Sequence, residues 1–159
     1  MALLSKSCVY GIRASIYIAS EEENGFIPIS QVAKELNLSP HFLTKILQEL
    51  TNEDLLLSHK GPRGGVKFAR DTSKIKLIEI IGAIDGMDLF TECALGLEGC
   101  GVYKPCPLHD SWTEHRRVLR ELFEEENLYD LAMNVKNAGL RLRTLDQKEI
   151  LDLKSSKKK

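Results

Sequence analysis

The sequence predicts a mainly α-helical protein with one small β-hairpin. Apolar residues recur at helical spacing in much of the chain, for example over 5–20 and 112–123. Two short apolar runs flank a Gly-Pro-Arg-Gly-Gly turn at 61–65, which is typical of a hairpin. A loop of about 25 residues at 87–110 follows neither periodicity, whereas most connections span ~4 to 6 residues. Such a loop usually has a function of its own.

The composition is that of an ordinary globular protein. Of the 159 residues 43% are hydrophobic and 28% charged, and the net charge of -1 gives no global argument for a nucleic-acid partner. Lys6 and Arg13 interrupt the apolar run at the N-terminus, which argues against a signal peptide, and no run of about 18 apolar residues predicts a membrane span. We therefore expect a cytoplasmic protein, in which cysteines are more often ligands or free thiols than disulfides.

Two helices are predicted at the N-terminus. Ser5 is a suitable N-cap for the first helix, over residues 5–20, and Asn24 and Gly25 end it. Ser30 is expected to cap a short second helix that buries its apolar residues on one side.

A third helix completes a helix-turn-helix. Ser39 and Pro40 form a strong helix start, because the N–H that proline lacks would be unpaired at this position. The turn before it has about three residues, so the second helix of the pair is expected to enter a major groove of DNA. An ordinary helical hairpin with a solvated polar face is the alternative. The candidate major-groove residues are Ser39, His41, Thr44, Lys45 and Gln48.

The next segment predicts a hairpin with a basic tip. Residues 55–58 and 66–69 are the two apolar runs, and Lys60 and Arg63 carry positive charge between them. Glycines at the tip let the backbone approach phosphates closely. A basic hairpin after a helix-turn-helix is a wing, so we expect residues 1–72 to form a winged helix-turn-helix DNA-binding domain. A solvated hairpin with incidental cations is the alternative.

The second half of the chain predicts helices that join two subunits. One very apolar helix ends with Gly86 as its C-terminal cap, and a longer helix begins at Asp110 or Ser111 and breaks near 124–127. A small winged domain cannot cover both apolar surfaces. We therefore expect residues 73–135 to contain two dimerisation helices, the second of them long, joined by the loop at 87–110. Together these helices would form the interface of a homodimer.

The last segment, 136–159, is expected to form a short helix and a basic tail. Thr144 and Gln147 have the spacing of a capping box, which predicts where this helix begins.

The long loop contains a candidate metal centre. Three cysteines and a histidine lie within 17 positions of this loop. So many soft ligands close together favour a metal site, because a bound metal supplies the ordering energy that such a loop lacks. Zinc sites usually use closer pairs such as C-x-x-C, whereas an iron–sulfur cluster needs ligands around several atoms, so the spacing favours a cluster over zinc. A solvated or capping histidine is the alternative at the last position. The candidate ligands are Cys93, Cys100, Cys106 and His109, separated by six, five and two residues.

Catalysis finds little support in the sequence. There is no phosphate loop, no nucleophile elbow and no H-E-x-x-H motif, and the acidic run at 124–126 is typical of a solvated face. We therefore expect neither an enzyme nor a small-molecule substrate.

Taken together, these segments resemble the Rrf2 family of bacterial winged-helix regulators. The resemblance covers residues 1 to about 135 and lies in LLSKSCVYGIRASIYIA, SPHFLTKILQEL, KGPRGGVKFAR, AIDG and the cysteine loop that ends in CPLH. It implies a homodimer that binds palindromic, double-stranded promoter DNA, with the second helix in the major groove and the wing in the adjacent minor groove. It also implies an iron–sulfur cluster that senses oxidants, nitric oxide or iron–sulfur status.

Branches of the family imply different ligands. The IscR-type pattern, three cysteines and a histidine two residues after the last of them, implies a [2Fe–2S] rather than a [4Fe–4S] cluster on the four candidate ligands. The NsrR-type pattern takes its fourth ligand from the first helix of the other subunit, so Cys8 stays a candidate beside its simpler role as a core residue. The CymR-type pattern has no cluster.

Two features depart from the family pattern. The first cysteine interval is one residue longer than in the IscR type, and the wing has Lys60 and Val66 where arginine and an aromatic residue are common. Lysine keeps the charge but lacks the planar fork of arginine. A zinc-bound or cofactor-free regulator of the same fold is one alternative. A small iron–sulfur electron-transfer or carrier protein is another, which explains the cysteines but not the wing.

Overall fold

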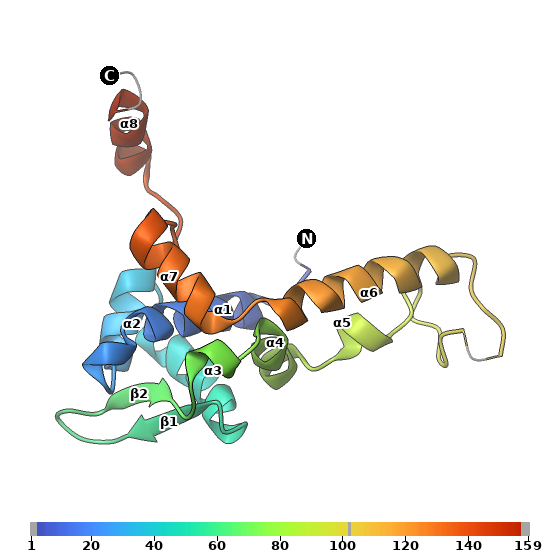
Figure 1. Cartoon of the computed structure of the whole chain (residues 1–159), viewed down its shortest axis with the longest axis horizontal. Coiled ribbons are helices and arrows are strands. Elements are labelled where there is room, and N and C mark those ends of the chain that lie inside the picture. Colours follow the sequence, from blue (N-terminus) through green and yellow to red (C-terminus); the bar gives the residue numbers. More distant parts are fainter. Residues whose placement is uncertain (1–2, 102, 157–159) are drawn as a thin grey trace.

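The computed structural model describes residues 3–101 and 103–156, and it confirms a mainly helical fold with one two-stranded hairpin (Figure 1). Within this part of the chain, no helix is long and apolar enough to cross a membrane. The helices are α1 (Lys6–Ser20), α2 (Ile29–Leu36), α3 (Pro40–Asn52), α4 (Leu77–Asp85), α5 (Asp88–Thr91), α6 (His109–Glu125), α7 (Leu128–Ala138) and α8 (Gln147–Ser156). The strands are β1 (Leu56–His59) and β2 (Gly65–Phe68), and short 3-10 turns lie at η1 (Glu22–Asn24) and η2 (Thr72–Lys74).

Helix α1 is the centre of the hydrophobic core and packs against α7, α4 and α3. Gly11 allows α1 and α4 to pack closely, because a Cβ atom there would lie 2.3 Å from Cδ1 of Ile84 on α4, which would have to move. Ser5 caps α1 as predicted, since its Oγ accepts a hydrogen bond from the Cys8 N–H at 3.0 Å. Asp85 accepts from the Ser5 N–H at 2.8 Å and so fixes the start of α1 to the end of α4.

Helices α2 and α3 form the predicted helix-turn-helix. Asn37 ends α2 in the left-handed conformation, with φ 53°, and turns the chain towards α3. Ser39 and Pro40 start α3 as predicted. The apolar residues of α3 pack into the core, namely Leu43, Ile46, Leu47 and Leu50.

The starts of three helices differ from the sequence prediction. Ser30 is not the cap of α2, because Pro28, with φ -60° and ψ 134°, already occupies the cap position. Helix α6 begins at His109 rather than after Asp110 or Ser111, because the Trp112 N–H already donates to Leu108 O at 2.8 Å.

The third difference is at α8, where the capping pair is shifted by two residues from Thr144 and Gln147. The Glu149 N–H donates to Asp146 Oδ1 at 2.8 Å, and the Asp146 N–H donates to Glu149 Oε2 at 2.9 Å. Carboxylates accept such bonds more strongly than a hydroxyl or an amide. Arg143 also pairs with Glu149, and hydrogen bonding to its guanidinium lowers the pKa of the Glu149 carboxyl to about 2.

The hairpin is attached to the segment before α2. Strands β1 and β2 pair antiparallel, with Ser58 opposite Val66. Val66 also pairs with Ile27, and the N–H of each residue donates to the carbonyl of the other at 2.9 Å. The wing therefore shares hydrogen bonds with the chain that leads into the helix-turn-helix.

Two glycines of the wing serve this close packing. A Cβ atom at Gly65 would lie 2.2 Å from Ile27 O, and one at Gly64 would lie 2.4 Å from His59 O. Gly61, with φ 117°, faces open space. Of these three glycines, Gly64 and Gly65 are thus needed because a side chain at either position would collide with nearby backbone atoms.

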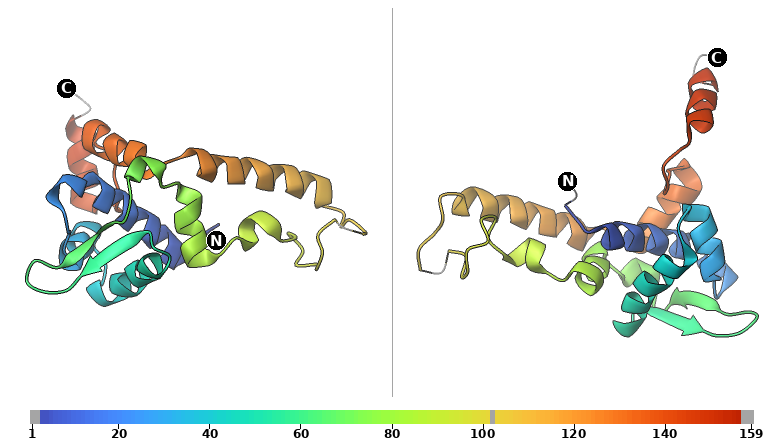
Figure 2. Two further views of the ribbon diagram at one scale, coloured as in Figure 1. Left: turned by 60° about the horizontal axis from the view of Figure 1, so that its bottom comes forward. Right: turned by 180° about the vertical axis from the view of Figure 1, so that it is seen from behind.

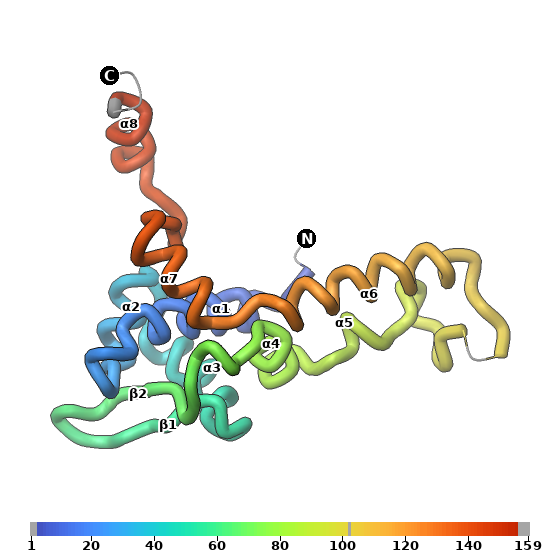
Figure 3. Tube along the Cα trace, viewed as in Figure 1, coloured from blue at the N-terminus to red at the C-terminus, as the bar shows by residue number. Residues whose placement is uncertain are grey.

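An arm, residues 88–125, projects from the body and consists of α5, the long loop and α6 (Figures 1 and 2). Among its described residues, α6 buries no side chain fully. The chain then returns to the body at α7, where the Leu128 N–H donates to Ile75 O at 3.0 Å. The tube in Figure 3 shows α8 standing away from the body in another direction.

Candidate metal centre and nucleic-acid interface

The four predicted ligands lie together in the loop between α5 and α6. Cys93 Sγ lies 3.7 Å from Cys106 Sγ, and Cys100 Sγ lies 3.5 Å from His109 Nδ1. Cys93 is buried, the other three are half-buried, and the cysteines are free thiols. Side chains spread over 17 positions of the sequence therefore form two adjacent pairs.

His109 is held against the backbone of the loop. A Cβ atom at Gly101 would lie 1.9 Å from Cε1 and 2.4 Å from Nε2 of the His109 ring, and Gly101 has a φ of 76°. Only glycine fits both the contact and the conformation. Gly96, Gly99 and Gly101 all lie between the ligand positions, and nothing in the sequence distinguishes Gly101 from the other two.

The sulfur of Cys93 is in a polar environment. Hydrogen bonds from the N–H groups of Leu95 and Leu97 lower the pKa of the Cys93 thiol. Burial raises the pKa of Cys106 beside it. One sulfur of this pair is therefore prepared to carry negative charge, as a thiolate ligand must.

The arrangement is not that of a closed site for one ion. In residues 3–101 and 103–156, no group of three or more His, Cys, Asp or Glu side chains is placed to hold a single metal ion. The two pairs are adjacent, because the side chain of Cys93 interacts with that of Cys100 as well as with that of Cys106.

Two side chains that the sequence did not assign to the site connect the loop to α6. Trp112 Nε1 donates to Glu92 O at 2.8 Å, and Arg116 Nη1 donates to Glu92 O at 2.7 Å and to Thr91 O at 2.8 Å. These carbonyls directly precede Cys93. Spacing along the chain gave no signal for these bonds, because their partners are 20 to 25 positions apart.

Cys8 lies in a separate apolar cluster with Ile81 and Phe90. Burial, with a contribution from the Asp85 carboxylate, raises the pKa of the Cys8 thiol to about 12. In this arrangement Cys8 is a protonated core residue, as its simpler interpretation predicted.

The seven predicted DNA-binding side chains are all exposed. Thr44, Gln48 and Lys60 line one groove of about 290 Å³ between α3 and the hairpin. The others, Ser39, His41, Lys45 and Arg63, do not line this groove.

Sequence reasoning missed three polar side chains of the same groove, Thr51, Asn52 and Ser58. Thr51 follows Gln48 by three positions on α3, and Ser58 precedes Lys60 by two positions at the hairpin. Asn52 follows Gln48 by four positions, so helical and strand periodicity would have placed all three beside residues already chosen.

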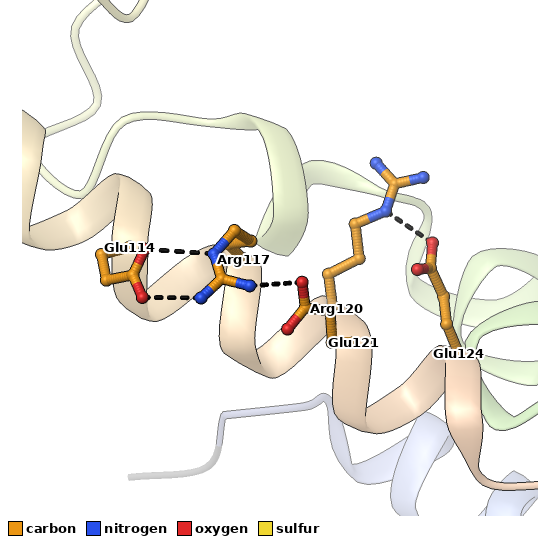
Figure 4. A network of polar contacts seen from close by, with 5 residues as sticks. All are labelled: Glu114, Arg117, Arg120, Glu121 and Glu124. Atoms are coloured by element: carbon orange, nitrogen blue, oxygen red, sulfur yellow. Dashed lines mark hydrogen bonds and ion pairs between the residues drawn. The ribbon is translucent and has the colours of Figure 1, made fainter.

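Helix α6 has a charged face and an apolar face. Figure 4 shows the charged face, where Glu114 pairs with Arg117 at 2.7 Å and Arg120 pairs with Glu124 at 2.7 Å. Arg117 also pairs with Glu121. Elsewhere on α6, Val118 and Leu122 leave 51% and 50% of their surface exposed.

Known proteins with similar sequences are transcriptional regulators. Residues 4–134 match the family model of Rrf2, described as an iron-dependent transcriptional regulator. The HTH-type transcriptional regulator IscR of Photorhabdus laumondii subsp. laumondii is 30% identical over 134 residues, which cover 84% of this chain and 80% of the relative. The IscR of Xenorhabdus nematophila is 28% identical, again over 84% of this chain and 80% of the relative.

Solved structures show the same fold. The CymR of B. subtilis, described as its global cysteine regulator, has a TM-score of 0.69 and 25% identity, over 83% of this chain and 97% of that chain. The T. potens IscR has a TM-score of 0.69 and 22% identity, over 87% of this chain and 91% of that chain.

The fold and these matches define a winged helix-turn-helix, DNA-binding transcriptional regulator, not an enzyme. The chain belongs to the Rrf2 family. This confirms the resemblance in the sequence and argues against the alternative of a small electron carrier.

Proposed function

We propose that this regulator is a cytoplasmic homodimer that binds double-stranded promoter DNA and holds a [2Fe–2S] cluster. The cluster ligands are Cys93, Cys100, Cys106 and His109. The observation that carries the proposal is the arrangement of these side chains as two ligand pairs, with separations of 3.7 and 3.5 Å, in one loop.

Two pairs suit a two-iron cluster better than a single ion. Each iron of such a cluster takes two protein ligands, whereas tetrahedral zinc needs its ligands around one point. Among the described residues no such single-ion group is present. The family description as iron-dependent also supports iron. When bound, the cluster supplies a centre that responds to oxidants, nitric oxide or iron–sulfur status.

The loop's own backbone supports this ligand set. The N–H groups of Leu95 and Leu97 point to the Cys93 sulfur, and hydrogen bonds to ligand sulfurs are a usual means of tuning a cluster. Gly101 leaves room for the His109 ring to reach the site.

On DNA, α3 occupies the major groove and the hairpin reaches the adjacent minor groove. Lys45 and Gln48 are exposed on α3, and their side chains suit guanine and adenine edges respectively. Lys60 and Arg63 contact phosphates and position the domain. Thr44 donates its hydroxyl proton to Pro40 O at 2.8 Å, so its oxygen is left as an acceptor.

The loop is connected to the DNA-binding helix by packed elements. Trp112 and Arg116 join the chain before Cys93 to α6. Helix α6 contacts α4, and α4 contacts both α1 and α3. Binding of a cluster orders the loop and loss of the cluster releases it. The contacts through α6 and α4 can transmit this change to the position of α3.

Anaerobic purification tests the proposal. We expect a coloured protein with visible absorbance and about two iron and two sulfide per chain, because this is the content of a two-iron cluster. Cys93→Ser and Cys106→Ser should lose the colour and the iron. Cys8→Ser should keep both, because Cys8 is placed in the core.

Other outcomes would contradict the proposal in distinguishable ways. A colourless protein with one zinc per chain would indicate the zinc-bound regulator, and a metal-free protein that still binds promoter DNA would indicate the cofactor-free one. About four iron per chain would indicate a [4Fe–4S] cluster.

A further inference from the structure

The cysteines of the loop are not equivalent. The sulfur of Cys93 is in contact with the sulfur of Cys106 at 3.7 Å. Cys100 contacts an imidazole nitrogen at 3.5 Å, and its side chain also interacts with Cys93. Cys93 and Cys106 are 13 positions apart, so their contact results from the fold of the loop and not from neighbouring positions in sequence.

We propose that Cys93 and Cys106 form a redox-active dithiol, which hydrogen peroxide converts to an intramolecular disulfide when the chain holds no cluster. The inference concerns the loop assigned to the cluster above, but it needs only the thiols and an oxidant. It assigns to this pair a reversible modification site.

The reaction has two steps. The thiolate of one cysteine of the pair attacks one peroxide oxygen, the O–O bond breaks, and a sulfenic acid forms as water leaves. The thiolate of the other cysteine then attacks the sulfenic sulfur, the S–O bond breaks, and a second water leaves with the released proton. In total two thiols lose two electrons and two protons, and one peroxide becomes two waters.

The loop can bring the two sulfurs to bonding distance. A disulfide needs a separation of about 2.05 Å, so the sulfurs must approach from their present contact. The backbone between them contains Gly96 and Gly99, which lie in open space at φ 67° and 64°. Trp112 and Arg116 hold the entry to the loop beside α6, which keeps Cys93 near the α6 end of the loop, where Cys106 lies.

Of the two remaining cysteines, Cys8 is buried in the cluster of Ile81 and Phe90 and cannot compete. Cys100 also interacts with Cys93, but it lies beside His109 Nδ1, whereas the sulfur of Cys106 lies 3.7 Å from that of Cys93. The disulfide would remove two of the four proposed cluster ligands. The oxidised chain should therefore be unable to take up a cluster until a thiol reductant restores the pair.

Mapping of the disulfide in the full-length, cluster-free protein tests this inference. The protein is stripped of iron with a chelator and reductant, desalted, treated with one equivalent of hydrogen peroxide, denatured and alkylated. Trypsin cannot separate Cys100 from Cys106 because Lys104 precedes Pro105, but cleavage after Glu98 and Tyr103 puts the three loop cysteines on separate peptides. We expect a peptide pair linked through Cys93 and Cys106, and a mass about 2 Da lower than that of the reduced chain.

Cysteine-to-serine variants test which cysteines form the bridge. Cys100→Ser should form the same link, whereas Cys93→Ser and Cys106→Ser should form no intramolecular link. A bridge that contains Cys100 or Cys8, a bridge between two chains, or oxidation without a bridge would overturn the inference.

Iron and sulfide uptake separates this inference from the proposed function. The oxidised protein should take up iron and sulfide only after reduction with dithiothreitol. If the peroxide-treated protein has no Cys93–Cys106 bridge and assembles a cluster normally, the disulfide alone is refuted. A bridge in a protein that never binds iron would support the disulfide and count against the proposed cluster.

Discussion

At the scale of single residues, the His109 ring packs against Gly101 in the loop, in the space that a side chain at position 101 would need. A Cβ atom on residue 101 would lie only 1.9 Å from Cε1 of the His109 imidazole. The position of the one nitrogen ligand in the proposed set therefore depends on a residue with no side chain. Two other loop glycines, Gly96 and Gly99, also have positive φ but face open space.

Replacement of Gly101 by alanine should displace His109 and weaken cluster binding. The new methyl group would overlap the ring, and the left-handed backbone would add about 1 kcal/mol of strain. We expect Gly101→Ala to contain less than about half the iron of the parent protein, since loss of one ligand contact of about 1 kcal/mol or more lowers affinity several-fold. Iron analysis and visible absorbance measure this.

Gly99→Ala is the matched control. It has the same backbone strain, with φ 64°, but no neighbour within 4 Å. Equal iron loss in both variants would show that strain, and not the position of His109, determines cluster binding.

At the scale of elements, the wing is attached to the body through Val66 and Ile27, while its cations remain exposed. Its position relative to α3 is therefore set by backbone hydrogen bonds, and Lys60 and Arg63 are not needed for folding. This separation makes the charges suitable for a test of DNA contact.

Lys60→Ala with Arg63→Ala should weaken promoter binding and flatten its salt dependence. Each lost phosphate contact should reduce the slope of log affinity against log salt by about 0.9. Fluorescence anisotropy at several salt concentrations measures the slope. The double variant Lys148→Ala, Lys154→Ala removes the same charge from α8, far from the wing (Figure 1), and should leave the slope unchanged. Identical slopes in both double variants would refute the wing assignment.

At the scale of the whole molecule, α6 lies on the projecting arm, where few other elements pack against it. Val118 and Leu122 are half exposed, although the opposite face carries a series of ion pairs (Figure 4). An apolar stripe of this kind on a projecting helix fits the interface of the proposed homodimer.

Val118→Glu should dissociate the homodimer. A carboxylate without a partner in an apolar interface costs about 3 kcal/mol, which raises the dissociation constant about 100-fold. Sedimentation over a concentration series measures this. Thr113→Glu adds the same charge to α6 beside Arg117, on the charged face, and should remain dimeric. A Val118→Glu protein that stays dimeric would place the interface elsewhere.

Much of the molecule could be predicted from short stretches of sequence. The helix start at Ser39 and Pro40, the cap at Ser5 and the hairpin around the glycine-rich turn depend on neighbouring residues, and the structure confirms them. Where two local signals competed, prediction was wrong. Pro28 took the cap position expected for Ser30, and two carboxylates formed the capping pair expected of Thr144 and Gln147.

The sequence by itself determined the class of this protein: the order of helix-turn-helix, wing and cysteine loop, and the family to which they belong. Only the tertiary structure decided that Cys93 meets Cys106 while Cys100 meets His109. It also decided that Trp112 and Arg116 hold the loop to α6. The physical reason is range: caps and turns are set by residues a few positions apart, whereas pairs 9 to 25 positions apart form only when the arm folds.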